Sequence, residues 1–245
     1  MSTAIVLYDI PSKSGKPWSN NVWKIRYALG YKGIAFKTKL IEYPDIEPTC
    51  KAIGAPPTGM KSDGSDMYTV PVIQDLSTGA VVADSFEIAK YLDKTYPDRP
   101  ALFPGNSVAL QKAFVQLESA RGPRSALPRQ AFLPMLQHVL RPASHAHFRH
   151  FKELGIGMTL EEAATGDMSA IATSFDWVAG YIDENGSGQF IMGEMISFAD
   201  FVVAGYLKWM QVIWGDSDVW KDISSWGNGR WIAYLDALAE YAGGF

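Results

Sequence analysis

Residues 70–86 read VPVIQDLSTGAVVADSF, and this stretch decides the fold. Two short apolar runs, Val72–Asp75 and Ala80–Ala83, flank a polar turn that contains glycine, which is the pattern of a β-hairpin. Pro71 stands at the head of the first run. Proline has no backbone N–H to donate to a neighbouring strand, so its presence at the start of a strand calls for a specific structural explanation. A cis Val70–Pro71 bond is such an explanation, because it turns the main chain of Val70 outward, where a peptide can pair with it.

Asp84 and Ser85 follow the second run and open a helical pattern that extends to Tyr96. A carboxylate and a hydroxyl suit a helix N-terminus, where free N–H groups and the helix dipole also favour an anion. Alone, Val-Pro is a common dipeptide and Asp-Ser an ordinary N-cap. In this order and at this spacing, they predict a receptor for a peptide-like ligand that carries a carboxylate at one end.

The segments that precede residue 70 alternate between strand and helix patterns. Two strands are predicted at Ala4–Ile10 and Ala35–Ile41, and a helix extends from Ser19 to Gly30 or Gly33. A short helix at Asp45–Gly54 and a Pro/Gly loop at Ala55–Gly64 follow. The predicted order is βαβα-ββα, an α/β domain over residues 1–96 with a mixed four-stranded sheet and helices on its faces.

Residues 97–107 have the proline-rich composition of a linker, and residues 108–245 show no convincing strand pattern. This second part is predicted to be an all-α domain. Its helical stretches lie near Val108–Ala120, Arg129–Leu140, Thr159–Thr165, Ser169–Asn185, Ser197–Ile213 and Gly229–Tyr241.

Ser197 and Asp200 resemble a capping box, and Ile196 and Phe201 occupy the positions of a hydrophobic staple. We interpret this segment as a structural helix start rather than as a ligand contact.

The composition limits the class of protein. The chain has 245 residues, 47% of them apolar, and a net charge of -4, which argues against a nucleic-acid ligand. No apolar stretch is long enough to span a bilayer, and no secretory signal pattern opens the chain. Cys50 is the single cysteine, so no internal disulfide can form, and we expect a cytoplasmic protein. Five of the eight tryptophans lie between Trp209 and Trp231, either as packing residues or as the lining of an aromatic cleft.

His145, His147 and His150 suggest a zinc site at first sight. Their spacing does not place them on one helical face, and no cysteine or tight carboxylate set joins them. We therefore expect no metal. Cys50 lies away from any helix start and is interpreted as a packing residue rather than a nucleophile.

The ordered set of Val70-Pro71, Asp84-Ser85, the proline-rich linker and the S-x-x-D box resembles the cytosolic glutathione transferases over essentially the whole chain. The stretch LYDIPSKSGKPWSNNVWKIRYAL is similar to the first strand, loop and helix of the bacterial β-aryl-etherases that cleave lignin-derived dimers. It is closer still to the fungal etherase-related transferases of the FuA class. The resemblance implies a thioredoxin-like first domain and a homodimer.

This resemblance also implies an activating serine just before the first helix, which by position is Ser19. The family often has proline after that serine, whereas this chain has Asn20, and Ser12 and Ser14 remain alternatives. The position that carries C-x-x-C in redox thioredoxins reads Ser19-Asn20-Asn21-Val22, which excludes dithiol chemistry.

The expected co-substrate is glutathione. We expect Asn21 at the site, the main chain of Val70 with Pro71 on the cysteinyl backbone, and Asp84 with Ser85 on the γ-glutamyl end. Lys39, or else Lys51 or Lys61, is expected to bind the glycyl carboxylate.

The predicted activity is attack of a serine-stabilised glutathione thiolate on an aromatic or phenolic electrophile, with β-aryl ether cleavage as one form. Two alternatives share the fold. One is a ligandin that binds polyphenolic compounds without turnover, and the other is a regulatory or structural relative without activity.

Overall fold

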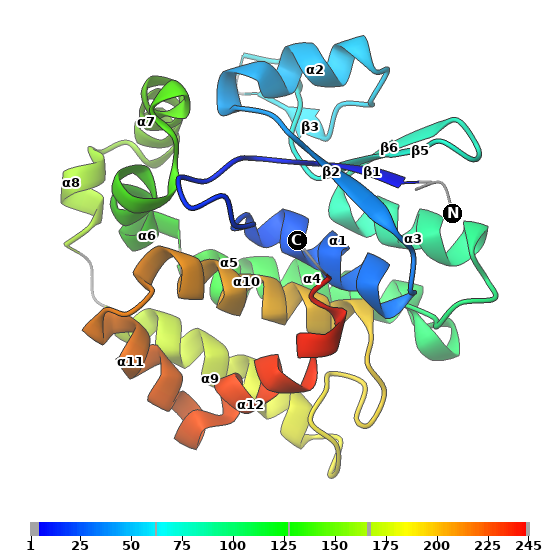
Figure 1. The fold of residues 1–245 in the computed structure, drawn as a ribbon. Coiled ribbons are helices and arrows are strands. Elements are labelled where there is room, and N and C mark those ends of the chain that lie inside the picture. Colours follow the sequence, from blue (N-terminus) through cyan, green and yellow to red (C-terminus); the bar gives the residue numbers. More distant parts are fainter. Residues whose placement is uncertain (1–4, 62, 127, 166–167, 244–245) are drawn as a thin grey trace.

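The computed structural model describes residues 5–61, 63–126, 128–165 and 168–243. A four-stranded sheet with the order β2-β1-β5-β6 forms its first half (Figure 1). The strands are β1 (Ile5–Asp9), β2 (Phe36–Leu40), β5 (Val72–Asp75) and β6 (Ala80–Ala83). β1 and β2 are parallel, and the other two neighbouring pairs are antiparallel. The predicted mixed sheet is confirmed, including both strands of the 70–86 hairpin.

Helices cover both faces of this sheet. α1 (Asn20–Tyr31) and α3 (Ser85–Thr95) pack against each other on one side, and α2 (Ile46–Ala52) lies on the other (Figure 1). Buried Asp9 at the end of β1 accepts from Arg26 of α1, with 3.0 Å between Oδ2 and the guanidinium Nη2. This ion pair fixes α1 on the strand that precedes it.

The stretch predicted as a loop at 55–64 contains part of a small hairpin, β3 (Gly59–Met60) and β4 (Asp66–Met67). These strands have two residues each and are exposed on both faces, so they lack the apolar alternation that identifies a strand in a sequence.

The second half of the described chain is helical, as predicted. Its α-helices are α4 (Val108–Arg121), α5 (Pro123–Ala126), α6 (Pro128–Pro134), α7 (Pro142–Ile156), α8 (Leu160–Ala163), α9 (Ser169–Asp183), α10 (Phe198–Trp214), α11 (Asp218–Ser225) and α12 (Arg230–Ala237). A π-helical turn at Met135–Val139 and short 3-10 helices at Tyr43–Asp45, Pro104–Asn106, Trp226–Gly229 and Ala239–Tyr241 complete the set. In the described part of the chain, no helix has the length and apolarity needed to cross a membrane.

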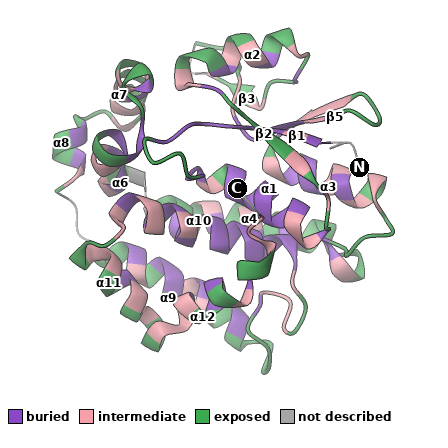
Figure 2. Cartoon of the chain, in the orientation of Figure 1, coloured by how far each residue is buried: buried purple, intermediate pink, exposed green. Residues whose placement is uncertain are grey.

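α10 is the central helix of the molecule and packs along α1, so it joins the two halves (Figure 2). It begins as predicted, with Ser197 as N-cap. Fully buried Asp200 accepts from the main-chain N–H and the hydroxyl of Ser197, both at 2.8 Å. It also accepts from Ile191 N–H at 2.7 Å and from the Tyr234 hydroxyl at 2.6 Å. The predicted capping box is confirmed.

Candidate active site

The register of the sheet brings three segments to one edge. Tyr8 of β1 pairs with Val72 of β5, and Val72 pairs with Ala83 of β6. The end of β1, the step before β5 and the residue after β6 therefore lie side by side. α1 and α3 both begin at this edge (Figure 1). The predicted receptor is thus assembled from residues that are far apart in the sequence.

Ser19 is the N-cap of α1 and is only 7% exposed. Its main-chain oxygen accepts from Trp23 N–H at 2.9 Å, whereas its hydroxyl makes no hydrogen bond to any residue that the structure describes. The preceding Trp18 is fixed by its indole N–H, which donates to the Ile10 oxygen at 2.9 Å. A hydroxyl held at a helix N-terminus without a protein partner is suited to donate to an anionic sulfur.

The hydroxyls of Ser12 and Ser14 are used inside the loop between β1 and α1. Ser12 Oγ donates to the Lys16 oxygen at 2.7 Å and lies 3.1 Å from Ser14 Oγ. The same loop is attached to the helical half, where Lys13 N–H donates to the Val139 oxygen at 2.8 Å. These contacts favour Ser19 over both alternatives as the free hydroxyl.

The Val70–Pro71 bond is cis, as predicted, and Val70 is buried. Within the described ranges, no protein group hydrogen-bonds to the main chain of Val70, which lies before the first ladder pair of β5. Its main chain is therefore available to an extended ligand, in the manner of β-strand addition.

Asp84 is the N-cap of α3, and its φ of 73° places it in the left-handed region. Its Oδ1 accepts from Phe86 N–H at 2.9 Å and from Glu87 N–H at 3.2 Å. The hydrogen bonds of the described structure use Oδ1 only, so Oδ2 of this exposed residue is left for a ligand. Ser85 follows as the first helical residue.

The predicted cations are not gathered at Asp84. Lys39 lies on β2, at the opposite side of the sheet from β6, with its ammonium 5.3 Å from the centre of the Tyr8 ring. Lys51 and Lys61 both bind Glu47, each with 2.7 Å between nitrogen and oxygen. Asn21 lies in the first turn of α1 beside Ser19, and its Oδ1 accepts from Lys24 Nζ at 2.8 Å.

Two charged residues near this edge were missed by the sequence analysis. Lys24 of α1 is 3% exposed and Glu118 of α4 is 1% exposed. Burial lowers the pKa of Lys24 to about 8, and the Glu118 carboxylate acts in the opposite direction. The one signal in the sequence is a lysine between Trp23 and Ile25, inside an apolar helical pattern.

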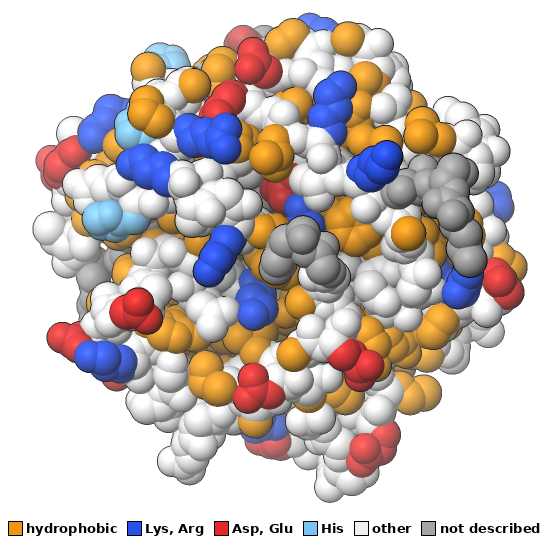
Figure 3. All heavy atoms as spheres, viewed as in Figure 1, with side chains coloured by type: hydrophobic (Ala, Val, Ile, Leu, Met, Phe, Trp, Pro, Cys, Tyr) orange, Lys and Arg blue, Asp and Glu red, His pale blue; other side chains and the backbone are white. Residues whose placement is uncertain are grey.

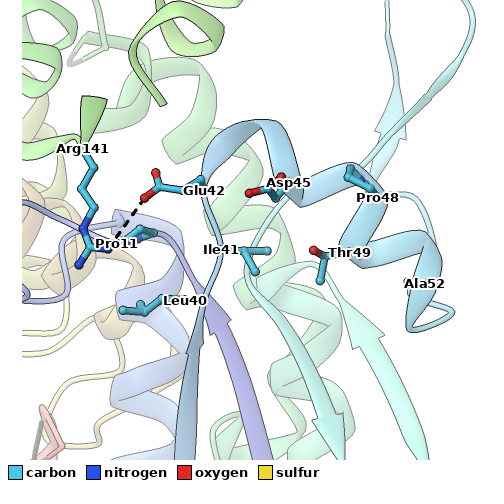
Figure 4. Close-up of a pocket in the computed structure, with 9 residues that line it drawn as sticks. All are labelled: Pro11, Leu40, Ile41, Glu42, Asp45, Pro48, Thr49, Ala52 and Arg141. Atoms are coloured by element: carbon cyan, nitrogen blue, oxygen red, sulfur yellow. Dashed lines mark ion pairs between the residues drawn. The ribbon is translucent and has the colours of Figure 1, made fainter. Parts of the chain in front are cut away.

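A hollow of about 530 Å³ lies on the β2 side of the loop that leads to Ser19 (Figure 4). Arg141 and Glu42 form one wall, 4.0 Å apart, and residues of α2 form the other. Its lining consists of Pro11, Leu40, Ile41, Glu42, Asp45, Pro48, Thr49, Ala52 and Arg141. A second hollow, of about 540 Å³, lies beside Asp84 between β6, α3 and α4. Acidic, basic and apolar side chains are mixed on the face shown in Figure 3, without a continuous basic stripe.

The three histidines take part in local contacts. His145 Nε2 lies 3.0 Å from the Leu140 oxygen, and the His147 ring packs on Tyr43 and Phe151. Within the described ranges, no three His, Cys, Asp or Glu residues are grouped as metal ligands. Cys50 is buried, and burial raises the pKa of its thiol, which fits a packing residue.

Trp209 and Trp231, at the two ends of the tryptophan-rich segment, are both buried. The Trp209 indole N–H donates to Met135 Sδ at 3.3 Å, and Trp231 packs on Phe175 and Tyr234. These two tryptophans are therefore packing residues.

Comparison with known proteins covers both halves of the chain. The family model for the glutathione S-transferase N-terminal domain matches residues 18–95, and the model for the glutathione S-transferase C-terminal domain matches residues 109–241. The glutathione S-transferase-like protein ustS of Aspergillus flavus is 30% identical over an alignment of 256 positions, which covers 98% of this chain and 90% of that protein.

Solved structures agree with these matches. The crystal structure of glutathione transferase GSTFuA2 from Phanerochaete chrysosporium is 41% identical, with a TM-score of 0.94 and coverage of 100% of both chains. The glutathione S-transferase CsGST63524 of Ceriporiopsis subvermispora, solved in complex with glutathione, is 37% identical, with a TM-score of 0.93 and coverage of 99% of both chains.

Proposed function

This chain belongs to the glutathione transferase family, and from that premise we propose that it binds glutathione along the sheet edge and holds the thiolate at Ser19 for attack on an aromatic electrophile. One observation carries the proposal. Ser19 offers a hydroxyl without a protein partner among the described residues, at the start of α1 and on the same edge as Val70 and Asp84.

The groups of the tripeptide match the groups at this edge. We propose that the main chain of Val70 pairs with the cysteinyl backbone, and that Asp84 Oδ2 and the Ser85 hydroxyl bind the γ-glutamyl end. A charge-assisted bond to the γ-glutamyl ammonium is worth about 1.5–3 kcal/mol. The complex of CsGST63524 with glutathione supports the choice of ligand.

For the glycyl carboxylate we propose Lys39. Its ammonium forms no ion pair with a described residue, whereas Lys51 and Lys61 share Glu47. Asn21, beside Ser19 in the first turn of α1, is proposed as a further contact to the ligand.

The proposed reaction is a displacement at carbon. The thiolate sulfur forms a C–S bond while the bond from carbon to the leaving group breaks with its electron pair. For a β-aryl ether the leaving group is a phenolate, which then takes a proton from solvent. The similarity to the GSTFuA structures supports this branch of the family.

Steady-state assays of the purified protein test the proposal directly. The panel consists of glutathione with aryl electrophiles and a fluorogenic β-aryl ether, and wild type is compared with Ser19→Ala. We expect turnover with at least one electrophile and its loss at neutral pH in the variant. Titration with a fluorescent aromatic dye runs in parallel. Dye binding without turnover of any electrophile would instead identify a ligandin.

The homodimer and the cytoplasmic location are retained as proposals. Leu110 and Leu117 on α4 are 71% and 43% exposed, and they lie on the helix that borders the hollow beside Asp84. Such apolar exposure supports association of two copies. Sedimentation equilibrium measures the molar mass, and a value of 27.0 kDa would indicate a monomer.

A further inference from the structure

Lys24 and Glu118 are opposite charges buried close to the start of α1, yet no ion pair within 4.0 Å joins them in the described structure. The Lys24 ammonium donates to Asn21 Oδ1 at 2.8 Å and lies 5.4 Å from the centre of the Tyr206 ring. Glu118 Oε1 accepts from Arg124 N–H at 2.8 Å, and Oε2 has no partner among the described residues. Each charge is thus only partly compensated.

The Lys24 side chain points toward the active edge. Its hydrogen-bond partner, Asn21, is three residues closer to the N-terminus of α1, so the side chain extends back along the helix. At about 1.5 Å of rise per residue, the first turn of α1 separates Asn21 from Lys24 by about 4.5 Å along the axis. The ammonium is therefore directed toward the N-terminal end of α1, where Ser19 is the N-cap.

Charged and aromatic side chains from both halves of the chain lie near this ammonium. The charged and titratable groups that face it are Asp84 at the start of α3, Glu118 of α4, Arg124 of α5 and Tyr206 of α10. Burial lowers the pKa of Lys24 to about 8, so the charged form still predominates at pH 7. Burial raises the pKa of Glu118, and the Lys24 charge opposes that rise. A buried charge is screened less by salt than an exposed one, so its field reaches its neighbours.

We propose that Lys24 and Glu118 are two opposed positioning residues for the reaction of the proposed function, on which this inference rests: the Lys24 charge favours the bound thiolate, and the Glu118 charge limits that effect. Neither group touches the sulfur, and both act on it through space. Together they set the fraction of glutathione that is ionised at Ser19.

The test is a pH titration of the ultraviolet absorbance of the thiolate in the complex with glutathione. We expect Lys24→Met to raise the pKa of the bound thiol by about one unit, because the variant loses a buried positive charge that favours the thiolate. We expect Glu118→Gln to lower it. Lys24→Arg should keep the wild-type value, because the charge remains. Lys221→Met, which removes a lysine charge from the exposed surface of α11, should leave it unchanged.

Opposite shifts in the two variants are required, because a loss of packing alone would not move the pKa in opposite directions. No shift in either variant, or shifts of the same sign, overturns the inference. If Lys24→Met does not fold, Glu118→Gln alone decides: a lower pKa of the bound thiol supports the inference, and an unchanged or higher pKa overturns it. Failure of wild type to bind glutathione would refute the proposed function itself. Normal binding, with a pKa that responds to Ser19→Ala but to neither charge, would refute this inference alone.

Discussion

Gly205 on α10 passes directly over Asn20 at the start of α1, and a Cβ atom at Gly205 would lie 2.7 Å from the Asn20 oxygen and 3.4 Å from Lys24 Cγ. Two helices approach this closely only where one of them lacks a side chain. The crossing lies next to Ser19, so the helical half of the molecule holds the first turn of α1 in place. The position of the candidate hydroxyl thus depends on a residue of the other half.

We expect Gly205→Ala to lower the free energy of unfolding by about 1–3 kcal/mol, because the clash is with main-chain atoms that must move. It should also reduce turnover by displacing Ser19. Thermal unfolding and steady-state kinetics measure the two effects. Gly180→Ala is the matched control, since no atom lies within 4 Å of a Cβ at that helical position. Gly180→Ala should stabilise the protein by about 0.5–1 kcal/mol. If the two variants changed stability and turnover equally, the close approach of α10 and α1 at Gly205 would be contradicted.

Asp84 combines a helix cap with the proposed ligand contact, and two substitutions separate these roles. Asp84→Asn keeps a side-chain acceptor and tolerates the positive φ, but removes the charge. We expect it to weaken glutathione binding by about 10- to 100-fold with little change in Tm. Asp84→Ala should show the same weakening and also lose about 0.5–2 kcal/mol of stability.

Calorimetric titration with glutathione provides the dissociation constants for these variants. Glu87→Gln, which neutralises another exposed carboxylate in the first turn of α3, should bind normally. Unchanged affinity in folded Asp84→Asn would remove Asp84 from the site.

The sequence was sufficient to predict those elements of the fold for which a short residue pattern is compatible with only one local structure. The hairpin after Pro71, the caps at Asp84 and Ser197 and the order of helices and strands along the first domain were all predicted from patterning and cap residues. α7 was not predicted: it begins at Pro142 and contains the three histidines, with only Ser144 and Phe148 buried, so its apolar stripe is weak. α11 also buries a single residue, Ile223.

The site was harder to predict, because much of it depends on contacts between residues that are far apart in the sequence rather than on local patterns. Cap patterns placed Ser19 and Asp84 at helix starts, and the family resemblance made Ser19 a site candidate. The pairing of Lys51 and Lys61 with Glu47 depends on how α2 and the β3–β4 hairpin pack. Lys24 and Glu118 become neighbours only because α1 and α4 both pack on α10. No spacing rule in the sequence relates positions on separate helices.

The Asp9–Arg26 ion pair links the sheet to α1. Arg26→Met should destabilise the fold, because it leaves the buried Asp9 carboxylate without its positive partner. Breaking one partner of a buried ion pair costs about 3–5 kcal/mol. Burial already raises the pKa of Asp9, and Arg26 opposes that rise, so the pKa should rise further in the variant. A carboxyl with a raised pKa in the folded state favours folding below its ordinary pKa of about 3.9, and this contribution is lost as pH rises through the folded value.

The stability difference between wild type and Arg26→Met should therefore widen from about pH 4 upward. Denaturant unfolding at several pH values measures it. The double variant Asp9→Asn, Arg26→Met has no buried carboxylate at this position, so its difference from wild type should change less with pH. A difference that narrows as pH rises in Arg26→Met would contradict the assigned sign.

Ser197→Ala combined with Asp200→Ala should destabilise the fold without affecting the ligand. The variant loses the helix start, at about 0.5–2 kcal/mol, and leaves the half-buried N–H of Ile191 and the buried hydroxyl of Tyr234 unpaired, at about 1–3 kcal/mol each. Tm should fall, while the dissociation constant for glutathione, measured well below that Tm, should stay near the wild-type value. Loss of binding with Tm intact would assign the segment to the site.

Ser19→Ala tests the chemistry most directly. A free thiol has a pKa near 8.5, and each unit by which the site lowers it corresponds to about 1.4 kcal/mol in favour of the thiolate. Without the hydroxyl, the apparent pKa in the pH–rate profile should rise and turnover at neutral pH should fall. Affinity for S-methylglutathione should be unchanged, because that ligand has no thiol to ionise and the rest of the edge is intact.

Ser12→Ala is the matched control for Ser19→Ala, because its hydroxyl bonds inside the loop and should not contribute to the pH profile. Ser19→Cys should behave differently from both. A thiol at a helix N-terminus has a lowered pKa and reacts with glutathione disulfide to form a mixed disulfide, releasing one glutathione thiolate. Its activity should therefore shift toward thiol exchange, which mass spectrometry detects as an added glutathione. If Ser19→Ala kept the wild-type profile and Ser12→Ala or Ser14→Ala lost it, the activating hydroxyl would lie earlier in the loop, and Asn20 in place of the family's proline would be the reason to examine first.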